Sequence, residues 1–162
     1  MSDDFPVRPG ESLLTFDAAE ADDARLAFIG TIRSPWREPA ACPKNMRAAR
    51  ERGENAEILI APPYRPALSR LEAGAHLHLL TWLDRSRRDL ALQKPRHAED
   101  ASGTFALRSP VRPNPIGLHL VRLVSIDLEA GRLVIDAIDA IDGTPLLDIK
   151  PYFASVDRPE DV

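Results

Sequence analysis

The chain has 162 residues, 44% of them hydrophobic, and a formal net charge of −4 at pH 7. This length suits one domain with a buried core, and no apolar run approaches the roughly 18 residues that a membrane span needs. The acidic balance disfavours extensive phosphate binding, and the acidic N-terminus lacks the blocks of a secretory signal. The single cysteine, Cys42, has no disulfide partner and no zinc-type spacing around it, so we expect a cytoplasmic protein without a metal.

An arm, a strand and a long loop are predicted first along the chain. Residues 1–24 contain acids and turn formers with little periodicity, which indicates an extended N-terminal arm before a domain of residues 25–162. "RLAFIGTIRSPW", residues 25–36, predicts the first strand, which Pro35 ends. The loop that follows contains "NMRAARERG", which could form one or two helical turns that stop at Gly53.

Short strands dominate the rest of the sequence. Their predicted ranges are 56–62, 75–84, 103–110, two alternating segments within 116–143, and 144–152, with a short helix at 64–74. Short strands that end in proline favour a mainly β fold, a small antiparallel β-barrel or sandwich with one or two short helices. No G-x-G-x-x-G follows a strand and no P-loop occurs, which disfavours a Rossmann nucleotide fold.

Arginines are concentrated in two neighbouring stretches. Residues 84–97 hold five cationic side chains against two acidic ones, which allows a local basic surface. In "RSPVRPNPIG" the prolines fix their own φ and push Arg112 and Asn114 toward extended geometry. Arg108 and Arg112 would then lose little freedom on binding an anion, and Gly117 permits close approach to a ligand. The alternative is a proline-rich connection with solvated arginines.

Four aspartates follow within residues 136–152: Asp136, Asp139, Asp142 and Asp148. Asp136 and Asp142 are predicted to share a strand face, with Asp139 on the other face. The turn "DGTP" would let Asp142 bond the backbone. Carboxylates here could bind an amine or ribose hydroxyls, or accept a proton, and the alternative is that they are turn formers and outward strand positions.

Two weaker candidates remain. "CPKN" places Lys44 and Asn45 after a proline in the long loop, which is most often a plain surface loop. His76 and His78 would share one strand face and could bind a metal, but such histidines are more often hydrogen-bonded residues of the core or edge, and we expect no metal site.

Taken together, these segments resemble the TsaA-like family, whose characterised members are the tRNA adenosine N6-methyltransferases called TrmO. "FIGTIRSPW" fits the family's first strand, "CPKN" its loop and "AHLHLLTWLDRS" its central strand. "RSPVRPNPIGL" and "DGTPLLDIKPY" match the two most diagnostic family motifs almost letter for letter. The resemblance spans residues 26–157.

The resemblance implies a homodimeric β-barrel methyltransferase that uses S-adenosylmethionine and methylates N6 of N6-threonylcarbamoyladenosine beside the tRNA anticodon. A non-catalytic S-adenosylmethionine-binding barrel, or a methyltransferase with another acceptor, stays open as an alternative. The family's cofactor contacts correspond here to Pro43, Lys44, Asn45, Asp84, Arg85, Arg108, Leu118, Asp139, Asp142, Gly143 and Thr144.

The same resemblance suggests roles in chemistry. Arg112, Asn114 and Lys150 are expected to bind the substrate. Asp142 is the first candidate proton acceptor and Tyr152 the second.

Three positions depart from the family pattern. Asn45 stands where glutamine is usual, Ala75 where serine precedes the histidine, and Asp84 where histidine follows the central strand. An amide nitrogen is a poor base, so Asn45 is expected to orient a ligand rather than accept a proton.

Overall fold

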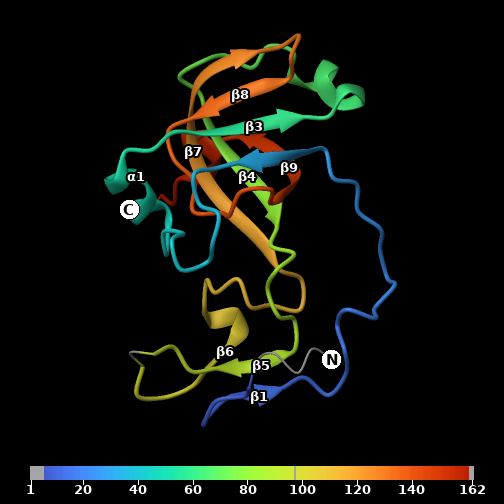
Figure 1. Cartoon of the computed structure of the whole chain (residues 1–162), viewed down its shortest axis with the longest axis vertical. Coiled ribbons are helices and arrows are strands. Elements are labelled where there is room, and N and C mark those ends of the chain that lie inside the picture. Colours follow the sequence, from blue (N-terminus) through green and yellow to red (C-terminus); the bar gives the residue numbers. More distant parts are fainter. Residues whose placement is uncertain (1–5, 97, 161–162) are drawn as a thin grey trace. The chain divides into compact units, whose positions relative to one another are not determined.

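A computed structural model of the chain describes residues 6–96 and 98–160. These residues form two compact units (Figure 1). The first, which we call the barrel unit, comprises residues 26–82 and 117–160. The second, the small unit, comprises the described parts of residues 6–25 and 83–116.

Six strands close into a barrel. They are β2 (Gly30–Arg33), β3 (Ala56–Ile60), β4 (His76–Trp82), β7 (Ile116–Asp127), β8 (Arg132–Ile135) and β9 (Pro145–Pro151). The order around the barrel is β2-β3-β8-β7-β4-β9, and antiparallel pairing of β2 with β9 closes it (Figure 1). The predicted mainly β fold and small antiparallel barrel are confirmed.

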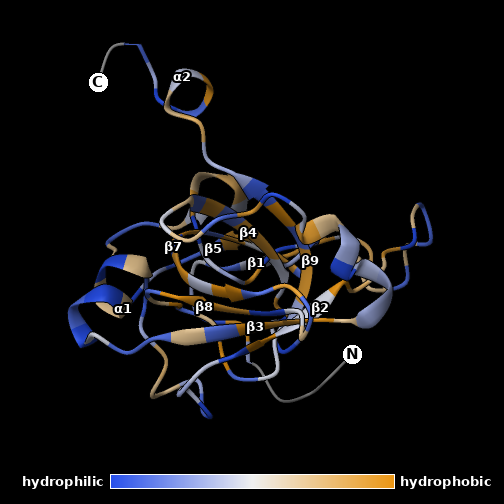
Figure 2. Ribbon diagram, turned by 90° about the horizontal axis from the view of Figure 1, so that it is seen from above, coloured by the Kyte–Doolittle hydropathy of each residue, from blue (hydrophilic) through white to orange (hydrophobic). Residues whose placement is uncertain are grey.

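The core follows from alternation along these strands. In β3, residues 56, 58 and 60 are buried while the residues between them are partly exposed. Strands β2, β4, β7 and β8 bury alternate residues in the same way, so their apolar side chains fill the barrel. Figure 2 shows these apolar stretches on the strands. Removal of this apolar surface from water is the main force that holds the barrel closed.

Helical segments connect the strands. Helix α1 (Met46–Arg52) has Asn45 as its N-cap and Gly53, with φ of 68°, as its C-cap, so the predicted stop at Gly53 is confirmed. The helix predicted at 64–74 is instead the 3₁₀ helix η1 (Pro62–Leu68), because its three prolines cannot donate α-helical hydrogen bonds. A single turn, α2 (Ala154–Asp157), follows β9.

The small unit contains a sheet of three short strands in the order β1-β5-β6. These strands are β1 (Ser12–Leu13), β5 (Leu90–Gln93) and β6 (Ser102–Gly103), and the 3₁₀ helix η2 (Thr104–Ala106) follows them. The strand predicted at 103–110 is therefore wrong beyond Gly103. The cause is a long-range contact, since the Thr104 hydroxyl donates to the Leu90 carbonyl oxygen at 2.8 Å and turns the chain.

Part of the predicted arm, Ser12–Leu13, forms strand β1 and pairs antiparallel with β5 in the small unit. Residues 1–5 of that arm lie outside the described residues. The domain boundary at residue 24 stays a prediction.

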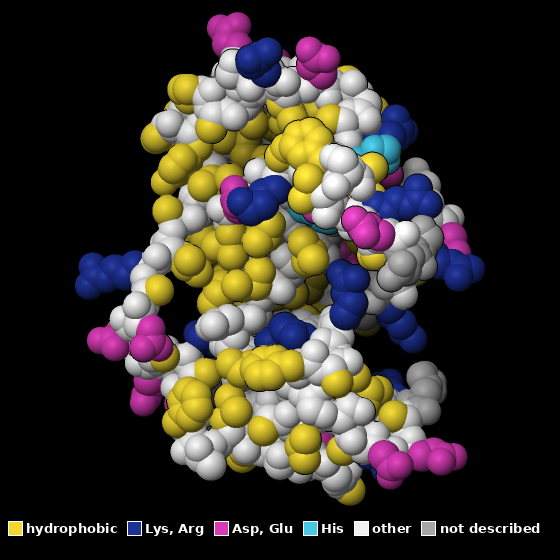
Figure 3. Space-filling model, turned by 180° about the vertical axis from the view of Figure 1, so that it is seen from behind, with side chains coloured by type: hydrophobic (Ala, Val, Ile, Leu, Met, Phe, Trp, Pro, Cys, Tyr) yellow, Lys and Arg dark blue, Asp and Glu magenta, His cyan; other side chains and the backbone are white. Residues whose placement is uncertain are grey.

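The surface of the barrel unit is not uniformly polar. Its exposed large apolar side chains include Tyr64, Leu118, Val124, Leu128, Phe153 and Val156, and Figure 3 shows apolar areas at the surface. Within residues 6–96 and 98–160, no helix is both long and apolar enough to cross a membrane.

Candidate functional site

The segment between β8 and β9, residues 136–144, forms a loop. Consecutive residues Ala137 and Ile138 are both buried, which a two-faced strand does not allow. The prediction that Asp136 and Asp142 share one strand face is therefore wrong, because β8 ends before both of them.

This loop is fastened to the chain that leaves β2. The Ser34 hydroxyl donates to the Ala140 carbonyl oxygen at 2.8 Å, and the Trp36 indole N–H donates to the Ile138 carbonyl oxygen at 2.8 Å. In return, the Asp142 N–H donates to the Trp36 carbonyl oxygen at 2.8 Å. Six polar groups of two distant segments are thereby satisfied, so the loop has a fixed conformation.

Asp142 has partners for both carboxylate oxygens. Oδ1 accepts from the Ser34 N–H at 3.1 Å, while Oδ2 is 2.8 Å from Nη1 of Arg37 and 3.7 Å from Nη1 of Arg33. The next residue, Gly143, has φ of 86°, a conformation that favours glycine. The turn at residues 142–143 is confirmed, but Asp142 does not make the predicted Asx-turn, because its Oδ1 accepts from Ser34, 108 positions away. Asp142 is instead an anchor between that turn and the chain that leaves β2.

The other two aspartates of the loop have different partners. Asp136 accepts from the Arg122 N–H at 2.8 Å and lies 3.4 Å from Nε of Arg50. Asp139 has its Oδ1 2.5 Å from Nδ1 of His119, a buried side chain of β7. No local sequence pattern indicates this contact, because the two residues are separated by 20 positions.

The "CPKN" loop begins α1. Pro43 is buried, Lys44 is exposed, and the Asn45 side-chain oxygen accepts from the Ala48 N–H at 2.9 Å. An amide at the N-cap uses its oxygen for the helix and leaves its NH₂ group to donate elsewhere.

Electrostatics connects this loop to Asp139. The pKa of Cys42 is raised to about 11, first by burial of the thiol and then by the negative charge of Asp139. The loop is further braced by Arg52, which donates to the Ala41 carbonyl oxygen at 2.6 Å and lies over the ring of Trp36. The barrel unit therefore places Cys42, the neighbour of Pro43, near Asp139 of the 136–144 loop.

Three further predicted cofactor contacts and two substrate contacts lie in the small unit, while Leu118 lies on β7 of the barrel unit. Asp84, Arg85 and Arg108 have exposed side chains. Arg112 donates to the carbonyl oxygens of its own loop, at 2.6 Å and 3.2 Å, so its guanidinium helps to hold that loop. The roles predicted for these residues stay predictions.

Arg88 holds the same loop and was not singled out from the sequence. Its Nε donates to the Pro113 carbonyl oxygen at 2.6 Å, and its Nη2 lies 3.4 Å from Oδ1 of Asn114. Another bond joins Nη2 to the Ala18 carbonyl oxygen at 2.6 Å. The prolines of this loop therefore act together with an arginine that the motif does not contain.

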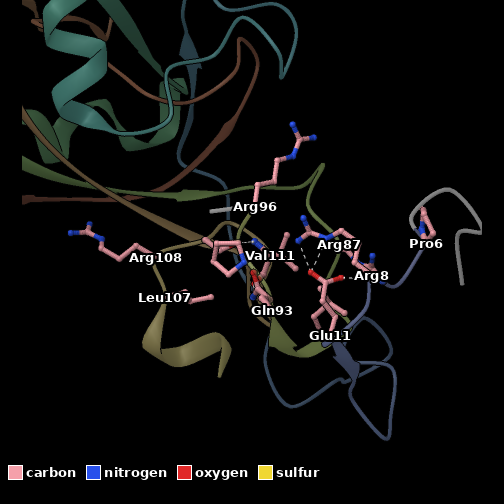
Figure 4. Close-up of a pocket in the computed structure, with 12 residues that line it drawn as sticks. Pro6, Arg8, Glu11, Arg87, Gln93, Arg96, Leu107, Arg108 and Val111 are labelled. Atoms are coloured by element: carbon pink, nitrogen blue, oxygen red, sulfur yellow. Dashed lines mark hydrogen bonds and ion pairs between the residues drawn. The ribbon is translucent and has the colours of Figure 1, made fainter. Parts of the chain in front are cut away.

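A cavity of about 520 Å³ opens in the small unit (Figure 4). Its lining includes four arginines, Arg8, Arg87, Arg96 and Arg108, and one acidic residue, Glu11. Arg8 bonds Glu11 and lowers the pKa of that carboxyl group, while Arg87 forms a bidentate pair with Asp89 at 2.7 Å and 2.9 Å. The lining therefore carries more positive than negative charge.

Lys150 and Tyr152 lie at and just beyond the end of β9. Lys150 is exposed and forms an ion pair with Asp148 at 3.0 Å. The ring of Tyr152 packs against His76 and His78, with ring centroids 6.4 Å and 5.6 Å away. Among the described residues, no group of three or more His, Cys, Asp or Glu side chains is arranged to hold a metal ion.

Comparison with known proteins identifies the family. The sequence profile of the tRNA-methyltransferase O N-terminal domain matches residues 31–158. The chain belongs to the TrmO family. Its barrel agrees with the crystal structure of TrmO from Pseudomonas aeruginosa, with a TM-score of 0.66 and 34% identity over 86% of this chain and 60% of that one.

Curated relatives of this TrmO-family chain have two kinds of names. A Rhizobium radiobacter protein, 41% identical over 82% of this chain and 73% of its own length, is named "Probable S-adenosyl-L-methionine-binding protein VirR". The Escherichia coli tRNA (adenine(37)-N6)-methyltransferase is 36% identical over 76% of this chain and 55% of its own length. The chain thus spans little more than half of that enzyme.

Asn45 now has a structural explanation as a departure from the TrmO pattern. Asparagine is among the best N-cap residues because its short side chain reaches the helix N–H groups, whereas glutamine is one carbon longer. Asn45 makes this cap to Ala48. Nothing in the structure explains the alanine at position 75.

Proposed function

We propose that this chain is an S-adenosylmethionine-dependent methyltransferase that methylates N6 of N6-threonylcarbamoyladenosine beside the anticodon of tRNA. The observation that carries the proposal is that residues on both sides of Pro43–Asn45 lie beside the 136–144 loop, since Arg50 pairs with Asp136 at 3.4 Å and the Cys42 thiol feels the charge of Asp139. The family resemblance implies that both segments hold the cofactor. Leu118 precedes His119, the partner of Asp139, but its exposed side chain lies on the other face of β7, so its assignment rests on the family resemblance.

The groups in this region suit the proposed cofactor. S-adenosylmethionine carries a carboxylate, an ammonium group and a positively charged sulfur, and it supplies an electrophilic methyl group. Lys44 is exposed and could pair with the carboxylate, while Asp139 offers a negative charge to the positive groups. The free NH₂ group of Asn45 would orient the ligand. The assignments of Asp142, Gly143 and Thr144 rest on the family resemblance.

Methyl transfer needs alignment and a place for one proton. When bound, the cofactor would supply the methyl group, and the acceptor nitrogen would have to give up one proton as it is methylated. Rigid loops favour such an in-line reaction because they hold the donor and acceptor close. We propose Asp142 or Tyr152 as the proton acceptor, and the existing bonds of Asp142 mean that it would have to exchange a partner first.

The acceptor RNA is proposed to meet the small unit. Its cavity presents Arg87 and Arg96, and guanidinium groups bind phosphate oxygens well, while Arg108 stays proposed as a cofactor contact. Arg112, Asn114 and Lys150 are proposed to contact the modified nucleoside. A tRNA substrate would place the protein in the cytoplasm.

We also propose that the protein is a homodimer, with residues 37–55 or the strand around residue 80 at the contact. A small barrel offers a shallow site, and a second copy would help to enclose the cofactor. Light scattering at micromolar concentration should give twice the chain mass, and a monomer would refute this part.

One observation favours a second function. Both oxygens of Asp142 are already bonded, and some relatives are named only for binding S-adenosylmethionine. A non-catalytic binding protein would use the same cofactor groups without a proton acceptor.

Incubation of the pure protein with S-adenosylmethionine labelled on its methyl group and bulk tRNA separates these functions. We expect the label to be transferred to tRNA. We also expect nucleoside mass spectrometry of a deletion strain to show loss of the methylated N6-threonylcarbamoyladenosine. Binding of the cofactor without transfer to any RNA supports the non-catalytic alternative or a different acceptor.

A further inference from the structure

A buried hydrogen-bond relay lies inside the barrel unit and ends at Asp139. Nδ1 of His119 is 2.5 Å from Oδ1 of Asp139, and Nε2 is 2.9 Å from Oγ1 of Thr81. Thr81 has no exposed surface, and His119 is 4% exposed, but 18% of the Asp139 side chain is exposed. Asp139 is therefore the member of the relay that a ligand can reach.

The chemistry of the three groups gives the relay a direction. An ionised carboxylate only accepts hydrogen bonds, so Nδ1 of His119 carries the hydrogen and donates the hydrogen bond to Asp139. In a neutral imidazole, Nε2 then accepts the hydroxyl hydrogen of Thr81. Thr81 thus fixes the ring and the ring fixes the carboxylate.

A nucleophilic role for this relay is ruled out by its burial. The residue types match a hydroxyl–imidazole–carboxylate triad, but Thr81 is fully enclosed in the barrel core, where no reactant could meet its oxygen. The relay can therefore act only outward, through Asp139.

Asp139 differs from its neighbours in the nature of its partner. Asp136 meets Arg50 and Asp142 meets Arg37, so each of those charges is opposed by an arginine. Within the part of the chain that the structure describes, no arginine or lysine forms an ion pair with Asp139. A partly exposed carboxylate that has no arginine or lysine partner attracts a cation from a ligand.

We propose that His119, held by Thr81, is a positioning residue that orients the Asp139 carboxylate toward the positive charge of bound S-adenosylmethionine. The inference rests on the proposed function. One oxygen of Asp139 is used by His119, and the other faces the ligand's ammonium or sulfonium group. Burial of the relay means that the carboxylate is already oriented before the cofactor arrives, so less entropy is lost on binding.

Calorimetric binding of three ligands to the full chain tests this role. S-adenosylmethionine has both positive groups, S-adenosylhomocysteine has only the ammonium, and 5′-methylthioadenosine has neither. His119→Leu removes the relay, and Thr81→Val removes only the hydroxyl. His119→Asn keeps a donor near the position of Nδ1, and Thr81→Ser keeps the hydroxyl. Val121→Ala, a buried truncation on the same strand and face, is the matched control for lost stability.

His119→Leu should weaken S-adenosylmethionine binding about tenfold or more, the loss expected when one charge-assisted hydrogen bond is misplaced. Binding of 5′-methylthioadenosine should stay unchanged. If His119→Leu also weakens binding of S-adenosylhomocysteine, Asp139 meets the ammonium group, and if it does not, Asp139 meets the sulfonium group. Thr81→Val should lose less S-adenosylmethionine affinity than His119→Leu does. His119→Asn and Thr81→Ser should keep most of the wild-type affinity.

An unchanged ratio of S-adenosylmethionine to 5′-methylthioadenosine affinity in His119→Leu and Thr81→Val overturns the inference. An equal change in Val121→Ala also overturns it, because the effect would then reflect stability alone. If His119→Leu does not fold, Thr81→Val and His119→Asn give the answer. A wild-type chain that does not bind S-adenosylmethionine refutes the proposed function itself.

Discussion

Replacement of Asp142 separates an anchoring role from a proton-accepting one. Asp142→Asn keeps an oxygen that can accept from the Ser34 N–H but removes the charge that faces Arg37 and Arg33. Asp142→Ala removes both contributions. Asp136→Asn is the matched control, because Asp136 also accepts from a backbone N–H and meets an arginine but is not proposed to hold the cofactor or to accept the proton.

The structure sets the size of each effect. The side chains of Arg37 and Arg33 are 78% and 53% exposed, and such exposed ion pairs contribute only about 0.2–1 kcal/mol. A partly buried N–H that loses its acceptor costs about 1–3 kcal/mol. Asp142→Asn should therefore lower the free energy of unfolding by about 0.5 kcal/mol, and Asp142→Ala by about 2 kcal/mol.

Urea unfolding and single-turnover methyl transfer measure the two roles independently. A loss in Asp142→Asn as large as in Asp142→Ala would refute the reasoning, because the ion pairs rather than the Ser34 bond would then be the anchor. If Asp142 accepts the proton, Asp142→Asn should slow transfer about 100-fold or more while Asp136→Asn does not. Transfer at the wild-type rate in Asp142→Asn would leave Tyr152 as the candidate acceptor.

Four further outcomes are expected. Gly117→Ala should lower the free energy of unfolding by about 1–3 kcal/mol in a urea titration, because the added Cβ would lie 2.4 Å from a buried hydroxyl oxygen. The pKa values of Glu11 and Asp89 are lowered by bonds to arginines, so the stability they give the small unit is present above the unfolded pKa values and is lost as pH falls through the folded ones. The protection factors of its amides, which compare each exchange rate with the intrinsic rate at the same pH, should therefore fall on acidification, and pH-independent protection factors would contradict this. Cys42, whose pKa is about 11, should react with iodoacetamide at pH 8 far more slowly in the folded chain than in urea. Arg96→Glu should weaken tRNA binding in a filter assay and flatten its dependence on salt, whereas an unchanged salt slope would remove Arg96 from the RNA contact.

The parts of the fold that the sequence predicted are those with local signals. Alternating apolar residues in β7 and β8, a proline shortly after β2, and Gly53 after α1 each act within a few positions, so they can be read without the rest of the chain. The barrel followed because such short strands have few ways to bury one apolar face.

The failures came from contacts between distant residues. Residues 136–144 look like a strand by composition, but the hydrogen bonds from Ser34 and Trp36 pull them into a loop. The residues after Gly103 also have the composition of a strand, but the hydrogen bond from Thr104 to the Leu90 carbonyl oxygen turns the chain there. Local periodicity cannot predict these contacts, because Leu90 lies 14 positions from Thr104 and Ser34 lies 106 positions from Ala140.

Gly117 shows how a correct physical reason can lead to an incomplete conclusion about a site. A glycine after a stiff proline turn does indicate that something approaches the backbone closely. In the structure, the atoms beside it are Oγ1 of Thr81 and Nε2 of His119, which a Cβ would meet at 2.4 Å and 2.6 Å. The space at Gly117 therefore belongs to the Thr81–His119 bond, and through that bond to the orientation of Asp139. If the proposed cofactor binds at Asp139, Gly117 contributes to that binding indirectly, because it leaves room for the Thr81 and His119 side chains that hold the Asp139 carboxylate.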